Sequence, residues 1–260
     1  MCSSDLVNGG LMVISADDPG LHSSQDEQDN RYYARAAKIA MLEPSDSQEA
    51  KDFVKVALEL SEQYDMPVMM RLTTRVCHSK SVVELGDGRT EVPFVPYQKK
   101  DKFNPVPAIS KQLHSKVERN LKELREYSNT TPLNQIIWGS KKVGIVSAGA
   151  AFQYAREIYG DAASYLKLGL TFPLPIEKIR EFAAQVEQLI VIEELEPIME
   201  TEIRAAGISC IGKDRIPNEG ELNPDILRKC LLGEVHESID FDSSVVAARP
   251  PVMCAGCPHR

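Results

Sequence analysis

The chain has 260 residues, of which 43% are hydrophobic, and its 38 acidic and 30 basic side chains give a formal net charge of -8. This length and composition allow a substantial buried core in one or two domains, which excludes an intrinsically disordered chain. The acidic balance argues against nucleic acid or an anionic membrane as a partner, and no apolar run approaches the ~20 residues of a bilayer-spanning helix.

The cysteines and the first residues bear on the cellular compartment. Six cysteines stand at positions 2, 77, 210, 230, 254 and 257 and are mostly isolated, which favours reduced thiols over a disulfide framework. The opening "MCSSDLVNGG" has neither the basic nor the apolar region of a secretory signal. We therefore expect a cytoplasmic protein.

Residues 7–80 alternate between strand and helix patterns. The short apolar runs "LMVISA" (11–16) and "MPVMMRLTT" (66–74) predict buried strands. Between them, Ser45 followed three residues later by Gln48 has the pattern of a capping box, which predicts the start of a helix. Because the second strand follows a crossover helix, the two strands should pair in parallel, as in an α/β fold.

Residues 81–140 have a different composition and predict a connector. An Asp87–Gly88 turn between two apolar runs indicates a hairpin, and residues 107–127 show a helical apolar stripe. The same turn, "GDGRT", resembles the opening of the motif that binds thiamine diphosphate and Mg²⁺. That motif follows a buried parallel strand, so the tight polar turn favours the hairpin.

Regular alternation returns over residues 141–233. The pattern predicts strands at 142–149, 164–169, 189–194 and 208–212, with helices between them. Gly160 is placed to end the first of these helices and Pro175 to open the second. The sequence therefore predicts a small doubly wound α/β domain.

The most polar loop of the first part lies directly after a predicted strand. The stretch "SADDPGLHSSQDEQDNRYYAR" (15–35) includes His22, Arg31 and Arg35. Open α/β sheets bind ligands at the carboxyl ends of their strands, so convergent side chains there would form a binding site. An ordinary polar surface loop explains the same residues equally well.

The chain finishes on "CAGCPHR", where Cys254 and Cys257 form a CxxC pair. Two thiolates at this spacing can hold part of a metal or iron–sulfur site or form a redox disulfide. One pair does not complete a four-cysteine site, and the pair alone does not choose between these alternatives.

Several stretches resemble one enzyme family. The run "VNGGLMVISADDPGLHSSQDEQDNRYYARAAKIAMLEPSDSQEAKDF", the later "RLTTRVCHSKSVVEL" and the final "RPPVMCAGCPHR" are similar to the alpha subunit of indolepyruvate:ferredoxin oxidoreductase. This is a thiamine diphosphate-dependent 2-oxoacid:ferredoxin oxidoreductase. The resemblance covers residues 7–260 and is most specific at "ADDPGLHSSQDEQDNR" and "CAGCPHR".

The resemblance implies a domain plan. Residues 7–80 would be the C-terminal half of a pyrimidine-type thiamine diphosphate domain, and 81–140 the connector. Residues 141–233 would be a transketolase C-terminal-like doubly wound domain, and 249–260 the start of a diphosphate-binding domain. Both ends of the family pattern then lie outside the chain, Met1–Leu6 do not fit it, and the isolated chain should lack oxidoreductase activity.

The resemblance also implies a reaction. The family oxidatively decarboxylates aryl-2-oxoacids such as indolepyruvate, using thiamine diphosphate with Mg²⁺, [4Fe–4S] clusters, coenzyme A, ferredoxin and a beta subunit. By this resemblance Arg35 first, and Arg31 second, would bind the substrate carboxylate, with His22 near the keto group. Cys254 and Cys257 would be iron–sulfur ligands, whereas the glutamate that activates the cofactor would lie outside the chain.

Two other functions fit the same residues. The chain could come from an enzyme for a different 2-oxoacid, such as a pyruvate or branched-chain oxidoreductase. It could also be a non-catalytic assembly module that binds a partner subunit without binding the cofactor.

Overall fold

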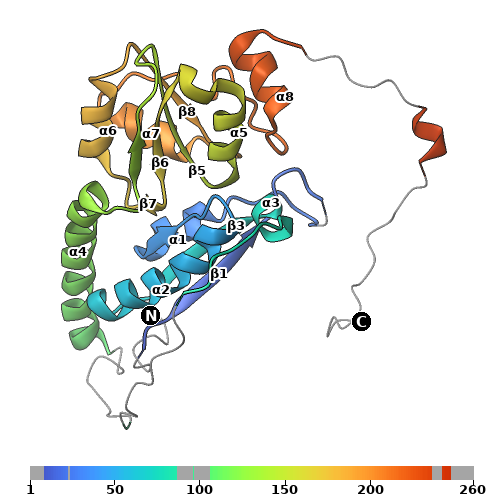
Figure 1. Cartoon of the computed structure of the whole chain (residues 1–260). Coiled ribbons are helices and arrows are strands. Elements are labelled where there is room, and N and C mark those ends of the chain that lie inside the picture. Colours follow the sequence, from blue (N-terminus) through green and yellow to red (C-terminus); the bar gives the residue numbers. More distant parts are fainter. Residues whose placement is uncertain (1–8, 23, 87–95, 97–105, 236–241, 247–260) are drawn as a thin grey trace.

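The computed structural model describes residues 9–22, 24–86, 96, 106–235 and 242–246, which form two α/β layers flanked by a long helix (Figure 1). The first layer contains β1 (Met12–Asp17), α1 (Arg31–Ala37), β2 (Ala40–Leu42), α2 (Ser47–Tyr64), β3 (Val68–Thr73) and α3 (Thr74–His78). The predicted hairpin at Asp87–Gly88, and Cys254 and Cys257, lie outside the described residues.

The remainder of the described chain holds the long helix and the second layer. Its elements are α4 (Pro107–Thr130), β4 (Gln135–Ile137), β5 (Val143–Ala148), α5 (Gly149–Tyr159), β6 (Ser164–Leu168), β7 (Leu170–Phe172), α6 (Ile176–Ala183), β8 (Gln188–Ile192), α7 (Ile198–Ala205) and α8 (Pro224–Leu227). A π-helical segment over Arg228–Leu232 extends α8, and single 3₁₀ turns cover Gly160–Ala162 and Ser243–Val245.

The first sheet has the strand order β1-β3-β2-β7. β1 and β3 pair in parallel from Met12 opposite Val68 to Asp17 opposite Thr73, which confirms the predicted pairing. β7 joins antiparallel to β2 at the other edge. α2 packs on the sheet through the buried side chains of Phe53 and Ala57. Because β1 and β3 run in parallel, their carboxyl ends lie at the same edge of the sheet.

The start of α2 differs from the predicted capping box. Asp46, not Ser45, is the cap, and its Oδ1 accepts a hydrogen bond from the Glu49 amide at 2.9 Å. The Glu49 carboxylate in turn accepts from the amide and the hydroxyl of Ser45 at 2.9 and 2.8 Å. A charged carboxylate is a stronger acceptor than a hydroxyl. The capping interactions therefore involve Asp46 and Glu49, one residue after the predicted Ser45 and Gln48.

The second sheet confirms the predicted doubly wound α/β class. Its order is β4-β6-β5-β8, with β6, β5 and β8 parallel and β4 antiparallel at the edge. Helices pack on both faces: one core cluster includes Ala155 of α5 and Leu227 of α8, and the other includes Ile179 of α6 and Ile203 of α7.

The strand predicted at 208–212 is reduced to one bridge, Ile190 with Ile211. Beyond Ile211 the chain turns away, because the amides of the next two residues bond to side chains. Gly212 donates to Asp214 Oδ1 at 2.9 Å and Lys213 to Glu200 Oε2 at 2.7 Å. The prediction of a fourth strand at this edge was wrong.

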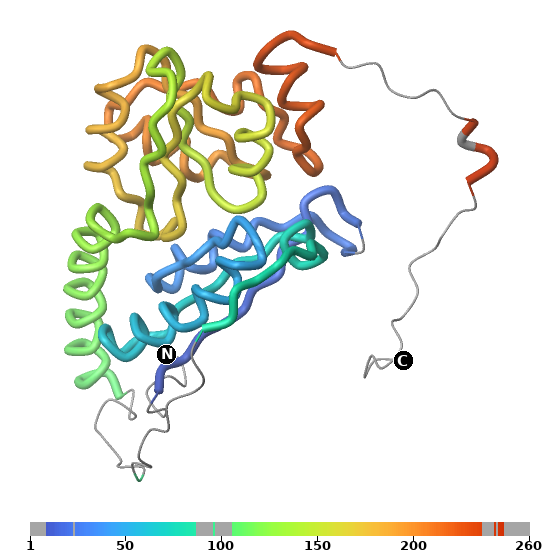
Figure 2. The backbone as a smooth tube through the Cα atoms, in the orientation of Figure 1, coloured from blue at the N-terminus to red at the C-terminus, as the bar shows by residue number. Residues whose placement is uncertain are grey.

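The two layers share elements across the expected domain boundary. β4, which precedes residue 141, belongs to the second sheet, whereas β7, which follows it, belongs to the first. Figure 2 shows α4 beside the first layer and leading into the second; it is fixed there by buried Leu124 and by Asn120 Nδ2, which donates to Tyr64 O at 2.6 Å. α4 is the longest described helix, yet neither it nor another described helix is apolar enough to cross a membrane.

Candidate functional site

The structure does not bring the three predicted substrate-binding residues into one site. His22 lies on the loop between β1 and α1, and its ring contacts Glu221. Arg31, the first residue of α1, is buried against the second layer, whereas Arg35, one turn later, borders a pocket. Each residue therefore has its own surroundings.

Arg31 is buried between the layers and is only 4% exposed. Its Nε donates to Asp29 Oδ1 at 2.9 Å, and its Nη2 donates to Asp29 Oδ2 at 2.6 Å and to the Glu194 and Glu196 carbonyls at 2.8 and 2.7 Å. Its Nη1 donates to Glu193 Oε2 at 2.5 Å. The guanidinium is thus surrounded by acceptors of its own chain.

Glu193, the partner of Arg31 in the second layer, lies at the N-terminus of α7. Its carboxylate accepts from the Met199 amide at 3.0 Å and from the Glu200 amide at 2.9 Å. Free amides and the helix dipole make a helix N-terminus favourable for an anion. Burial would raise the pKa of Asp29, but the hydrogen bond and charge of Arg31 outweigh it and lower that pKa. The ion pair between Arg31 and Glu193 therefore joins α1 to the N-terminus of α7.

A second buried charge cluster lies where the strands of the first sheet end. Arg71 of β3 donates to Asp17 Oδ2 at 2.9 Å and to Glu43 Oε2 at 2.7 Å. Glu43 Oε1 accepts from the Thr171 hydroxyl at 2.8 Å. Arg71 Nη2 also lies 2.8 Å from Asp17 Oδ2 as an ion pair, whereas the buried hydroxyl of Thr73 lacks a hydrogen-bond partner among the described residues. An unsatisfied hydroxyl at the ligand-binding edge of a sheet is suited to meet a further polar group.

The described residues do not fit the metal-bound diphosphate of thiamine diphosphate. Mg²⁺ takes oxygen ligands, often carboxylates, but among the described residues no three His, Cys, Asp or Glu side chains gather as a metal site. Asp17 and Glu43, the carboxylates at the sheet edge, are both ion-paired to Arg71. No reaction step through the cofactor follows from this part of the chain.

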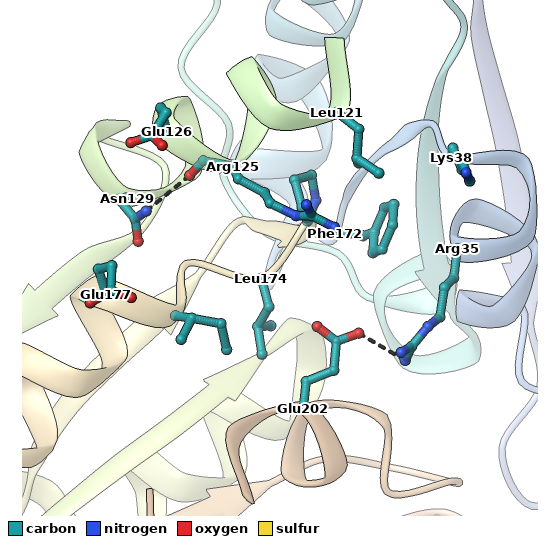
Figure 3. A pocket seen from close by; sticks show the side chains of 12 residues that line it. Arg35, Lys38, Leu121, Arg125, Glu126, Asn129, Phe172, Leu174, Glu177 and Glu202 are labelled. Atoms are coloured by element: carbon teal, nitrogen blue, oxygen red, sulfur yellow. Dashed lines mark hydrogen bonds and ion pairs between the residues drawn. The ribbon is translucent and has the colours of Figure 1, made fainter. Parts of the chain in front are cut away.

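Arg35 borders a pocket of about 470 Å³ between α1, α4, α6 and α7 (Figure 3). Its Nη1 lies 2.8 Å from Glu202 Oε1, and its side chain is 47% exposed. Burial raises the pKa of Glu202, while the charge of Arg35 acts in the opposite direction. The other lining residues are Lys38, Leu121, Arg125, Glu126, Asn129, Phe172, Pro173, Leu174, Ile176 and Glu177. The pocket combines an apolar floor with charges of both signs.

His22 lies on the loop that follows β1, near the residues that follow β3. Its Nε2 is 3.2 Å from Glu221 Oε2, and the same carboxylate pairs with the guanidinium of Arg75. Beneath it, Glu194 is buried, and desolvation raises the pKa of its carboxyl group to about 7. The buried carboxylate of Glu194 and the largely buried one of Glu221 thus bring the second layer against the loops of the first.

The sequence analysis missed Arg75, Glu193 and Glu221 as parts of these clusters. Arg75 lies inside "RLTTRVCHSKSVVEL", two residues after the end of β3, so the rule of strand carboxyl ends could have identified it. No sequence signal pairs Glu193 or Glu221 with partners so distant in the chain, because those contacts depend on the packing of the two layers.

Comparison with known proteins agrees with the resemblance read from the sequence. Residues 15–135 match the family described as "Pyruvate flavodoxin/ferredoxin oxidoreductase, thiamine diP-bdg". "Indolepyruvate oxidoreductase subunit IorA" of Methanothermobacter thermautotrophicus is 42% identical over 98% of this chain and 44% of its own length. The subunit of the same name from Archaeoglobus fulgidus is 36% identical over 96% of this chain and 43% of its own length.

The fold is similar to that of a solved enzyme. A 2-oxoglutarate:ferredoxin oxidoreductase from Magnetococcus marinus, solved with 2-oxoglutarate, coenzyme A and succinyl-CoA bound, superposes with a TM-score of 0.56 at 17% identity. The superposition covers 78% of this chain and 45% of that one. The present chain spans less than half the length of the relatives it matches. It resembles the indolepyruvate oxidoreductase subunits over nearly its whole length, and residues 15–135 resemble the thiamine diphosphate-binding domain of the pyruvate flavodoxin/ferredoxin oxidoreductases.

Proposed function

We propose that the chain is part of an enzyme that oxidatively decarboxylates aryl-2-oxoacids such as indolepyruvate, passing electrons to ferredoxin and the acyl group to coenzyme A. The observation that supports this most is the 42% identity to an indolepyruvate oxidoreductase subunit across 98% of the chain. The match of residues 15–135 to a thiamine diphosphate-binding domain supports the cofactor.

The remaining parts of the proposed enzyme come from the resemblance. They are Mg²⁺ with the thiamine diphosphate, [4Fe–4S] clusters with Cys254 and Cys257 among their ligands, and a beta subunit as the partner. The scattered cysteines support a cytoplasmic enzyme, since reduced thiols are typical of that compartment. Thiamine diphosphate would supply the carbanion chemistry, and protein residues would bind and orient the substrate.

The chain's own contribution is to bind the substrate and to hold its two layers in register. The assignment of the substrate carboxylate to Arg35 or Arg31 stays a prediction. Arg31 is surrounded by acceptors of the chain, whereas Arg35 has an exposed guanidinium at a pocket. His22, at the carboxyl end of β1, is the predicted residue whose position fits the ligand-binding edge of an open α/β sheet.

The test uses the complete subunit that contains this sequence, assembled with its partner subunit under anaerobic conditions. We expect ferredoxin reduction that requires indolepyruvate, coenzyme A and thiamine diphosphate together. We also expect a kcat/KM for indolepyruvate at least about ten-fold above that for pyruvate, since a pocket suited to a large apolar group loses that binding energy with a methyl group.

Two results would point to the alternatives. A higher kcat/KM for pyruvate or a branched-chain oxoacid would assign the chain to another 2-oxoacid oxidoreductase. Binding to the partner subunit without thiamine diphosphate affinity or turnover would favour the non-catalytic assembly module.

A further inference from the structure

Three polar side chains, from two loops and one short helix, meet where β1 and β3 end. His22 lies on the loop after β1, Arg75 lies in the short helix after β3, and Glu221 lies on the loop that precedes α8. We call this group the rim. It joins the first layer to the second at the edge where open α/β sheets bind their ligands.

The geometry of the rim is that of a carboxylate held by an arginine fork. Arg75 donates from Nε to Glu221 Oε1 and from Nη2 to Glu221 Oε2, the latter at 2.6 Å. His22 Nε2 approaches Oε2 at 3.2 Å as a third polar contact. Two parallel bonds from a planar guanidinium are how proteins recognise a free carboxylate ligand.

The backbone of Glu221 is held in place on both sides. Gly20 packs so closely that a Cβ there would lie 3.1 Å from the Glu221 amide nitrogen. The next amide, of Leu222, donates to the buried Glu194 Oε1 at 3.2 Å, and the Leu222 side chain is buried. Because the backbone is fixed, the Arg75 fork is emptied by a rotation of the Glu221 side chain and not by a movement of the loop.

Stability alone does not explain this arrangement. The Arg75 side chain is 59% exposed and that of Glu221 is 13% exposed, so water reaches the arginine side of the pair and weakens it toward the value of about 0–1 kcal/mol of exposed ion pairs. The Arg31 fork, in contrast, is buried and saturated by several acceptors. Arg75 is thus an accessible fork, occupied by one carboxylate, at the edge of the sheet that also holds His22.

We propose that Arg75 binds the carboxylate of the 2-oxoacid substrate, that His22 donates to the adjacent keto oxygen, and that Glu221 occupies the fork when substrate is absent. This inference rests on the proposed function and moves the carboxylate contact from Arg35 to Arg75. It also makes Glu221 a competitor of the substrate: each molecule that binds must displace the Glu221 carboxylate from the same two donors.

The experiment compares KM and kcat for indolepyruvate in the complete enzyme with four variants. Arg75→Ala should raise KM on the order of 10- to 100-fold, the effect of charged hydrogen bonds of about 1.5–3 kcal/mol. The kcat should stay within about three-fold if the contact is equal in ground and transition states. Arg75→Lys keeps the charge without the fork and should fall between Arg75→Ala and the wild type. Glu221→Gln should lower KM, because an amide competes less well for Arg75.

Arg180→Ala is the matched control. Arg180 is 48% exposed and pairs with Glu177 at 3.4 Å on α6, away from the rim, so its KM should match that of the wild type. Thermal midpoints of all variants check folding; should Arg75→Ala unfold, Arg75→Lys and Glu221→Gln still decide the matter.

The outcomes separate this inference from the proposed function. If the wild-type enzyme turns over no 2-oxoacid, both fail. If the wild type is active but Arg75→Ala and Arg75→Lys keep its KM, or Glu221→Gln raises it, only the inference is overturned. A merely structural ion pair would lower the thermal midpoint in the Arg75 and Glu221 variants alike and leave KM unchanged.

Discussion

Arg31 and Arg35 stand one turn apart on α1, yet their surroundings differ in nearly every respect. Arg31 is buried and donates to Asp29, Glu193 and two carbonyl groups. Arg35 is 47% exposed and has one ion pair, with Glu202. Both arginines face acidic groups at or near α7, so the same helix face contributes one interior and one surface contact between the layers.

The difference shows what makes an arginine structural. A guanidinium has five donors. When its own chain supplies most of their acceptors, binding a ligand instead would leave buried acceptors without a partner, which costs free energy. Residue type and spacing are the same for both arginines. Burial and the number of internal acceptors separate them, and these properties depend on the other layer.

The largest effect should follow from Arg31→Ala. The substitution leaves Asp29 and Glu193, both with buried side chains, without their cation. Breaking a buried ion pair from one side costs about 3–5 kcal/mol, so the free energy of unfolding should fall by that amount in urea titrations.

Arg31→Lys refines this prediction because it restores the charge but not the fork, and its loss should be smaller. A loss below about 1 kcal/mol for Arg31→Ala, typical of an exposed pair, would contradict the structural role of Arg31 and return it to the candidates for substrate binding.

Much of the fold could be predicted from the sequence, but the short strands could not. β1, β3, β5, β6 and β8 follow clear apolar runs, and Gly160 ends α5 as expected. The strands β2, β4 and β7 have three residues each, too few to show a period. β7 also pairs with a strand from the other end of the fold, which only the tertiary structure specifies.

The position of the candidate site could be predicted from the sequence, but the roles of its residues could not. The polar loop after β1 does lie at the carboxyl edge of the sheet, as strand order suggests. The role of Arg31 depends on Glu193, 162 residues further along the chain. Such a contact leaves no local pattern, since neither residue shares a helix, strand or turn with the other.

An intermediate effect should come from Glu194, which lies in the same interface but whose carboxylate accepts from the Leu222 amide and from no cation among the described residues. Desolvation raises the pKa of its carboxyl group from 4.5 to about 7. Between these values the folded state binds the proton more tightly than the unfolded state, so this group makes stability fall as pH rises from about 4.5 to 7.

Glu194→Gln should remove this dependence of stability on pH. For a pKa shift of this extent, the contribution to the free energy of unfolding that is removed is on the order of 3 kcal/mol. The measurement is the free energy of unfolding at pH 5 and pH 8 for both proteins, and the difference between the two pH values should be smaller in the variant. Equal slopes in the two proteins would mean that Glu194 stays ionised in the folded chain.

The smallest effect on stability should be that of Arg35→Ala. Its exposed pair with Glu202 is screened by water, so the free energy of unfolding should fall by less than about 1 kcal/mol. Because the variant stays folded, its KM for the 2-oxoacid can be measured in the complete enzyme. Comparing that KM with the KM of Arg75→Ala shows which of the two arginines binds the substrate carboxylate. A rise of about ten-fold or more, the size of one charged hydrogen bond, with none in Arg75→Ala, would assign the substrate carboxylate to Arg35. The reverse pattern would place the substrate carboxylate at the rim. Arg35 would then join the two layers through Glu202 as Arg31 does through Glu193, only more weakly.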